Sequence, residues 1–191
     1  KKLLLAVFSI TTTFSLYAQR EVPQERMEQI YEEVKTPYKY GLAIAPADNH
    51  HKIDCPTVFH QGDKWLMTYV VYNGKSGMDG RGYETWIAES DNLLEWRTLG
   101  RILSYRDGKW DCNQRGGFPA LPDMEWGGSY ELQTYKGRHW MTYIGGEGTG
   151  YEAVKAPLYI GLASTKGDIS TAHEWESLDK PILSIHDKDA Q

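Results

Sequence analysis

Hydrophobic and polar residues alternate in short segments, and these segments occur twice along the chain in the same order. The strand-like segment Lys64–Tyr69 returns as Arg138–Tyr143, each time after a turn that contains glycine. Each copy is followed by a second apolar segment, a tryptophan and an Ile-Leu-Ser segment: Trp86–Ser90, Trp96 and Arg101–Ser104, then Ile160–Ser164, Trp175 and Pro181–Ser184. Each unit therefore predicts about four short strands joined by turns, as in one blade of a β-propeller.

Two such units are fewer than a propeller needs. Repeat units bury their apolar faces against one another, and roughly three or more are required for stability. We therefore predict an all-β chain that holds about two blades of a longer propeller within residues 39–191. The first blade would span about 39–105, the second about 124–185, and a third would start after that. The alternative is a complete two-unit sandwich, whose open edge strands would favour aggregation.

The first residues have the pattern of an export signal. Lys1 and Lys2 precede an apolar stretch from Leu3 to Phe14, and the small residue Ala18 follows. This pattern predicts a secretory signal peptide over residues 1–18 and a periplasmic or extracellular mature protein that begins at Gln19. A signal anchor is the alternative, although the apolar stretch is too short to span a bilayer.

Residues 19–38 predict a helical extension. Met27, Ile30, Tyr31 and Val34 recur at the spacing of one helix face, and the pattern ends before Pro37. We expect this helix to pack on the rim of the propeller rather than to bind a partner.

Charge and cysteine content narrow the function classes. The chain has 191 residues and a formal net charge of -5, and its sequence has no basic block that would bind nucleic acid by releasing counterions. Cys55 and Cys112 would enter an oxidising compartment, where a disulfide is permitted. Because Cys55 shares one face of the alternating segment Ile53–Phe59 with apolar residues, we expect a buried free thiol, with a disulfide as the alternative.

Two carboxylates precede the repeated segment at matching places. The innermost strand of each propeller blade lines a central channel, so polar residues on these strands converge. We assign His50–Pro56 and Trp126–Leu132 to the innermost strands, which makes Asp54 and Glu131 the candidate catalytic residues. Hydrolysis of a glycosidic bond needs two carboxyl groups, one that protonates the leaving oxygen and one that activates water or attacks. The alternatives are a local backbone contact for Asp54, and a sugar contact or an ion pair with Arg115 for Glu131.

The segment Trp110–Trp126 between the units is long, rich in glycine and proline, and dense in side-chain donors, as functional loops are. Its arginine would bind a carboxylate or a pair of hydroxyls, and Trp126 would stack on a sugar face. Two adjacent histidines border the same pocket, but side chains next to each other in an extended segment point to opposite faces and do not share a metal. The candidate substrate-binding residues are His50, His51, Asn113, Arg115 and Trp126.

The run Asp54–Phe59, a glycine turn, an aromatic strand, Glu84–Ser90 and Trp96 together resemble the first blade of five-bladed propeller glycoside hydrolases, glycoside hydrolase family 43 in particular. In that family an Asp at the start of the first blade is the general base, commonly in an Asp-Pro pair. Here Cys55 separates Asp54 from Pro56. The resemblance implies an exported glycosidase that acts on a polysaccharide or oligosaccharide with inversion, with Asp54 as base and the general acid in a blade beyond Gln191.

The same resemblance implies no cofactor. A calcium ion lies in the channel of some related propellers, although the sequence here has no segment with the acidic spacing of a calcium loop. Two other functions fit the same scaffold: a non-catalytic glycan-binding propeller and a glycoside phosphorylase. We expect a carbohydrate as the partner, and neither a nucleic acid nor a membrane span.

Overall fold

The computed structural model describes residues 22–35, 42–48, 50–74, 80–151 and 156–188. The predicted signal peptide, residues 1–18, lies outside this part. The chain divides into two compact units, residues 1–39 and 40–191. Within the described ranges, no helix is both long enough and apolar enough to cross a membrane.

The first unit contains the helix that the sequence predicts. Helix α1 spans Gln24–Val34, and Pro23 precedes it. The Pro23 carbonyl accepts the first helical hydrogen bond, from the Met27 N–H at 3.0 Å. Proline suits this position because its fixed φ fits the start of a helix and it has no N–H to leave unpaired.

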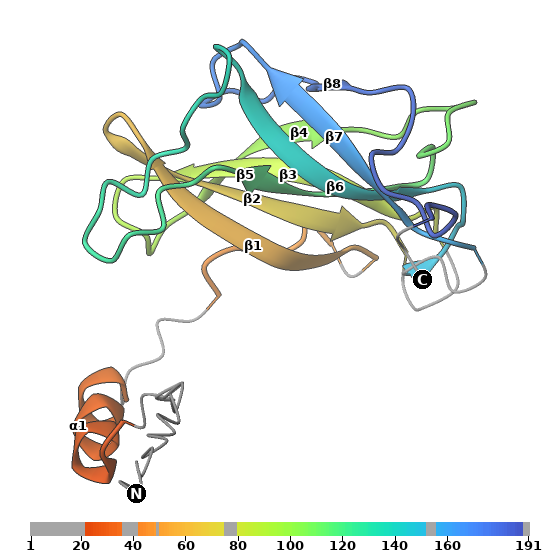
Figure 1. Cartoon of the computed structure of the whole chain (residues 1–191). Helices are drawn as coiled ribbons and strands as arrows, with labels where there is room; N and C mark the ends of the chain where they lie inside the picture. The colour runs from red at the N-terminus through yellow and green to blue at the C-terminus, as the bar shows by residue number, and fades with distance from the viewer. Residues whose placement is uncertain (1–21, 36–41, 49, 75–79, 152–155, 189–191) are drawn as a thin grey trace, which may run out of the picture. The chain divides into compact units, whose positions relative to one another are not determined.

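The second unit contains two antiparallel sheets of four strands each (Figure 1). The first sheet consists of β1 (Lys52–Gln61), β2 (Lys64–Tyr72), β3 (Tyr83–Ser90) and β4 (Arg97–Leu103). The second consists of β5 (Gln114–Ala120), β6 (His139–Gly146), β7 (Tyr159–Thr165) and β8 (Glu176–Ser177). Strands follow one another in each sheet in their sequence order. The predicted all-β class, with four strands per unit and one short helix, is confirmed.

The repeated segment forms the second strand of each sheet, β2 and β6, which has a partner on both sides. Every residue from Leu66 to Tyr72 is buried. A continuous apolar run is expected of a strand whose two faces are both covered. The repeat in the sequence therefore corresponds to the same place in two equivalent sheets.

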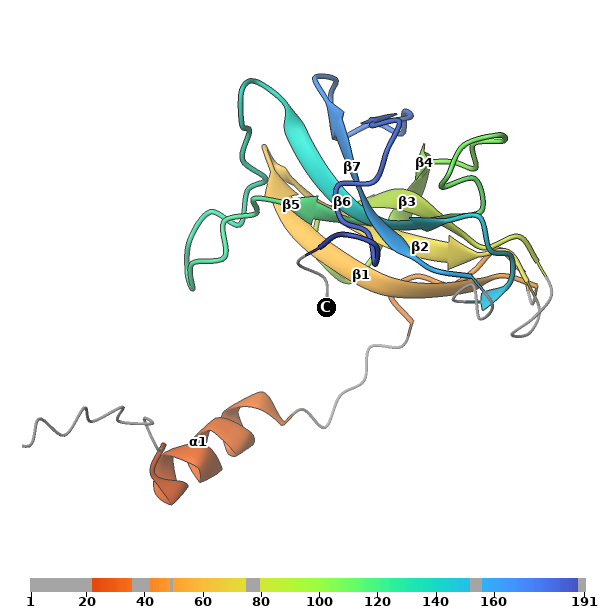
Figure 2. The same cartoon turned by 45° about the vertical axis from the view of Figure 1, so that its right-hand side comes forward.

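One apolar core joins the two sheets. β5 contacts β2 and β3 of the first sheet, and Figures 1 and 2 both show it lying beside them. Residues from the first sheet, the second sheet and the segments that follow β5 and β7 form one buried cluster: Phe59, Leu66, Ile87, Ile102, Leu103, Leu132, Met141, Tyr143, Ala163, Ile169 and Trp175. The two sheets are thus packed parts of one body, and they hold their facing edges in fixed positions.

The first strand of the second sheet lies earlier than the sequence predicts. We assigned it to Trp126–Leu132 and the preceding segment to a loop, whereas the structure has β5 at Gln114–Ala120. Two glycines and Pro119 hide this strand from a propensity analysis. The proline is tolerated because β5 is an edge strand, where a missing N–H costs no ladder hydrogen bond.

The glycines of β5 allow the first sheet to come close. A Cβ atom on Gly116 would lie 3.2 Å from Val70 Cγ1, and one on Gly117 would lie 3.0 Å from Leu103 Cδ1. Between these strands the buried hydroxyl of Thr85 donates to the Arg115 carbonyl at 2.7 Å and accepts from the Gly117 N–H at 2.7 Å. One side chain of β3 therefore binds the free edge of β5.

Candidate functional site

The candidate catalytic residue Asp54 lies at a bulge in β1. Asp54 pairs with Val70 and Thr57 pairs with Thr68, so β1 has one residue more than β2 between these pairs. Cys55 has a φ of +51°, a left-handed conformation that residues other than glycine rarely adopt. The Asp54 carboxylate accepts the Cys55 N–H at 2.7 Å and holds this conformation. Bulges of this kind redirect side chains and are frequent beside active sites.

The bulge changes the face on which Cys55 lies. Strict alternation placed Ile53 and Cys55 together on one face, and this prediction is wrong. Ile53 lines a cavity on one side of the first sheet, whereas Asp54 and Cys55 line a cavity on the other side, between the two sheets. An extra residue in a strand reverses the face of everything that follows it, which alternation in the sequence does not reveal.

The cavity beside Asp54 has a volume of about 280 Å³. Five strands and the segment before β7 supply its walls: Asp54, Cys55, Val70, Tyr83, Gly116, Phe118, Ile144 and Leu158. Asp54 is the one carboxylate among these lining residues, and it is exposed to solvent. A water-accessible carboxylate against apolar and aromatic walls is suited to accept a proton from a water molecule that attacks a bound ligand.

Aromatic rings extend the site beyond the cavity. The Tyr83 ring lies 5.6 Å from the rings of both Tyr72 and Tyr151, and these two meet edge to face at 5.4 Å. The Lys52 ammonium lies over the same group, 5.9 Å from the Tyr72 ring and 5.4 Å from the Tyr151 ring. Sequence reasoning missed these residues, although Lys52 and Asp54 stand two positions apart in one strand, as residues on the same face do.

The structure does not bring Glu131 to Asp54. Glu131 lies in the excursion between β5 and β6, where its backbone forms a bridge with His60. Asp54 and His60 are about 20 Å apart along β1 at roughly 3.3 Å per residue. Two carboxyl groups that act on one glycosidic bond lie within about 10 Å of each other. The expectation that these two carboxylates meet in one channel is therefore not met, because Glu131 is not on the innermost strand of its sheet.

Arg115 is part of the core and not of an open loop. Its side chain is fully buried and forms ion pairs with Asp111 at 3.2 Å and with Glu174 at 2.6 Å. It also donates to the Ser104 carbonyl and the Ser177 hydroxyl. These partners occupy the guanidinium, so it does not reach a sugar.

Asn113 lies directly before β5 and ties loops together. Its amide oxygen accepts from Arg81 Nε at 2.6 Å, and its amide nitrogen donates to the Glu147 carbonyl at 2.6 Å. Asn113 thus fixes the loops at the end of the sheets where Asp54 lies, because β5 starts there.

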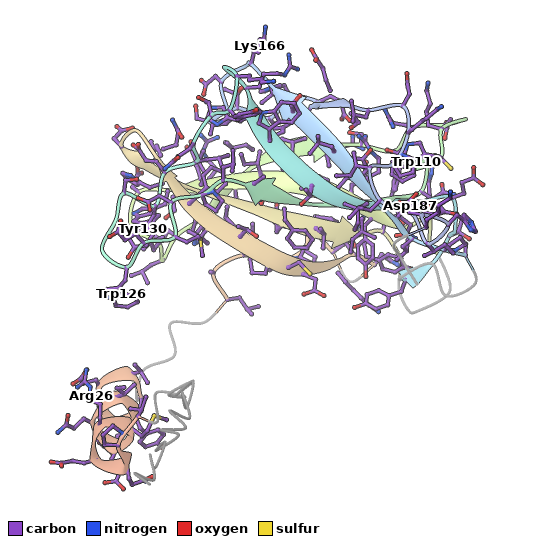
Figure 3. All side chains as sticks on the ribbon, in the orientation of Figure 1. Arg26, Trp110, Trp126, Tyr130, Lys166 and Asp187 are labelled. Carbon is purple, nitrogen blue, oxygen red and sulfur yellow. The ribbon has the colours of Figure 1, made fainter. Side chains whose placement is uncertain are left out.

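Trp126 lies far from Asp54. Its side chain is 97% exposed and belongs to the excursion between β5 and β6. Figure 3 shows Trp126 and Tyr130 at one end of the sheets, with Trp110 and Asp187 at the opposite end. Asp54 belongs to the Trp110 end, because the walls of its cavity come from the start of β5 and the end of β6. Trp126 is therefore free to contact a ligand, but not one held at Asp54.

The two histidines lie on neither wall of the Asp54 cavity. The His51 ring bonds the Asp48 carboxylate at 2.8 Å, and this bond lowers the pKa of Asp48. His51 lines the cavity of about 300 Å³ on the other side of the first sheet, together with Ile53 and Trp86. His50 is exposed, and its N–H donates to Asp48 at 2.7 Å.

Metal and redox chemistry find little support in the described ranges. No group of three or more His, Cys, Asp or Glu side chains there is arranged to hold a metal ion. Cys112 is a free thiol, and burial raises its pKa.

Comparison with known proteins adds a direct relationship. No family model matches the sequence, and no curated protein does. A solved structure described as "Glycoside hydrolase" is 93% identical over 90% of this chain, with a TM-score of 0.83. The chain is similar to a glycoside hydrolase. A second solved structure, described as a complex of BT0996 and RGII, has the same identity, coverage and TM-score. The chain spans 49%, about half, of the length of each of these two solved proteins.

Proposed function

We propose that this chain is part of a glycoside hydrolase that binds its glycan at the Asp54 cavity, with Asp54 as the general base. The observation that carries the proposal is the 93% identity to a solved glycoside hydrolase. The geometry of the site supports it, since an exposed carboxylate lies at a cavity that two packed sheets hold open. The complex of the second solved protein makes RGII the first carbohydrate to test.

The bulge gives Asp54 a position suited to catalysis. Asp54 and the strained Cys55 lie where the two sheets come together, so neighbouring strands fix the carboxylate in place. Residues in rare backbone conformations persist where their surroundings determine them, and they concentrate at functional sites. Hydrolysis requires a second carboxyl group as acid. None lines the cavity in the described residues, and we propose that it comes from the other half of the full-length protein.

Replacement of Asp54 by Asn tests the general base. The Asn side-chain oxygen still accepts the Cys55 N–H, so the bulge survives while the proton acceptor is lost. We expect kcat on RGII to fall by a factor of roughly a hundred to ten thousand in the full-length protein, the usual contribution of a positioned base. The thermal unfolding midpoint should stay unchanged.

Asp63→Asn is the matched control, because Asp63 is an exposed carboxylate in the β1–β2 hairpin, remote from the cavity. It should leave kcat unchanged. If Asp54→Asn also retains full turnover, Asp54 is not the base.

A second function follows from the single carboxylate in the cavity. A propeller that binds a glycan without cleaving it would use the same aromatic walls and need no acid. It predicts saturable binding of RGII with no product. Product formation that requires inorganic phosphate would instead indicate a phosphorylase.

We propose further that the two sheets are the first two blades of a propeller and that the protein is exported. The strand order supports the blades, because each sheet runs from an inner first strand to an outer fourth one in sequence order. The charged and apolar pattern of residues 1–18 supports export. N-terminal sequencing of the secreted protein should begin at Gln19, and a mature protein that retains residues 1–18 would contradict this.

A further inference from the structure

We propose that Lys52 is a specificity residue and that the glycan carries an acidic sugar, with a carboxylate or a sulfate group, next to the sugar held at Asp54. The proposal rests on the proposed function, since it concerns the same site. Lys52 follows from the arrangement of charges around the cavity, and Asp54 provides the neighbouring reactive position.

Lys52 differs from the other cations at this end of the sheets. Arg81 pairs with Asp107, Arg106 with Asp111 at 2.7 Å, and Lys109 with Asp179 at 3.0 Å. In the part of the protein that the structure describes, Lys52 forms no ion pair with a carboxylate. Its positive charge is therefore still available to an anion.

Two rings hold the Lys52 ammonium in place. It lies over Tyr72 and Tyr151, which meet edge to face, and Tyr72 is buried and thus rigid. The attraction between a cation and an aromatic face leaves the remaining N–H groups of the ammonium to donate elsewhere. A cation fixed in this way binds an anion with less loss of side-chain freedom than a mobile lysine does.

The cavity and the lysine form one continuous surface. Tyr83 lines the Asp54 cavity and contacts both of the rings beneath Lys52. Lys52 and Asp54 lie on the same side of β1, about 7 Å apart at roughly 3.3 Å per residue. Two adjoining sugar units can therefore touch Asp54 and Lys52 at once, and the tyrosine rings give the second unit an apolar face to lie on.

Overall charge makes this contact specific to the site. The chain has a net charge of -5, so an acidic glycan gains nothing from the long-range field of the protein. Recognition of an anion then depends on a local cation, and it should weaken as salt screens the charges over about 8–10 Å.

Binding to short sugars tests the proposal separately from catalysis. The probes are the methyl glycosides of glucuronic acid and of glucose 6-sulfate, each against neutral methyl glucoside, titrated into the full-length Asp54→Asn protein. We expect one acidic probe to bind about ten times or more tightly than the neutral one, the usual effect of one charge-assisted contact. Lys52→Met should abolish this preference. The acidic probe that is preferred identifies the anionic group.

Lys136→Met is the matched control, because the Lys136 ammonium also lies over a tyrosine ring, that of Tyr135 at 5.3 Å, at the other end of the sheets. It should leave the preference unchanged. Equal binding of acidic and neutral probes, or a preference that survives Lys52→Met, overturns the inference about Lys52. These titrations do not depend on turnover, so a failure of the proposed hydrolase activity gives a different result: binding preference without any product from the wild-type protein.

Discussion

At the scale of single residues, the buried charges of this protein hold the fold together. Asp111 and Arg115 are both fully buried and face each other at 3.2 Å. Arg106 binds the same carboxylate through two hydrogen bonds, and Tyr143 donates its hydroxyl to it at 2.8 Å. A charge inside a protein is tolerated when it is paired and its hydrogen bonds are complete. The residue that the sequence marked as a sugar ligand, Arg115, is instead one half of such a pair.

Tyr143 makes stability depend on alkaline pH. Burial, and then the hydrogen bond to Asp111, raise its pKa from 10.0 to about 12. Between these values the unfolded chain loses the proton and the folded one keeps it, so the free energy of unfolding falls as pH rises from about 10 to about 12. The contribution of Tyr143 is full below pH 10 and amounts to about 2–3 kcal/mol.

Urea unfolding at several pH values measures this fall. Tyr143→Phe should make it smaller by about 2 kcal/mol, whereas Tyr135→Phe, at a tyrosine that is 56% exposed, should leave it unchanged. An equal fall in both variants would show that Tyr143 keeps its ordinary pKa in the folded protein.

At the scale of elements, the parts that the sequence predicts well are those whose own residues determine their structure. The repeated segment is apolar and β-branched or aromatic, so β2 and β6 follow from it directly. Strand β5 is different, since its glycines and Pro119 fit a strand only because the first sheet lies against it. The bulge at Cys55 is also hidden, because no Gly marks the left-handed position.

The candidate site divides in the same way. Asp54 was predicted from its place before the repeat, and the structure puts it at a cavity. Glu131 and Trp126 were assigned from the wrong first strand, so their positions failed together with that strand. Lys52 and Tyr151 were missed because nothing in the sequence shows that segments so far apart meet.

The Thr85 contact between β3 and β5 predicts a measurable contribution to stability. Thr85→Val keeps the shape of the threonine side group and leaves the buried Arg115 carbonyl and Gly117 N–H without their partner. We expect the free energy of unfolding to fall by about 1–3 kcal/mol, the cost of leaving buried polar groups unpaired.

Thr68→Val on the neighbouring strand is the control for this prediction. The Thr68 hydroxyl is buried and has no hydrogen-bond partner among the described residues. Its removal should be neutral or stabilising, since an unsatisfied polar group is lost. Chemical denaturation of both variants decides the matter, and equal destabilisation would mean that the Thr85 contact does not join the sheets.

At the scale of the whole molecule, the described residues leave apolar surface at the outer part of the second sheet. Leu183 forms a bridge with Ile160 but is 59% exposed, and Ile182 and Ile185 are 42% and 56% exposed. These residues and Leu158 line a cavity of about 580 Å³ or lie beside it. An apolar region of this kind is expected of a surface against which another sheet packs.

Leu183→Asp in the full-length protein tests whether a further sheet covers this surface. If it does, the charge is buried, and the free energy of unfolding should fall by about 2–4 kcal/mol. Leu94→Asp, at an exposed leucine in the turn before β4, should change it by less than about 0.5 kcal/mol. Differential scanning calorimetry that finds the same effect for both substitutions would show that Leu183 faces solvent in the whole protein.

The order of the strands also determines how the protein can be made. Each strand pairs with the one synthesised just before it, so the contacts within a sheet are local in sequence. Local contacts form quickly, and the amino-terminal parts of a protein fold while the ribosome still adds residues. The first sheet can thus be complete before β5 leaves the exit tunnel, and Thr85 then offers the emerging strand its first fixed point of attachment.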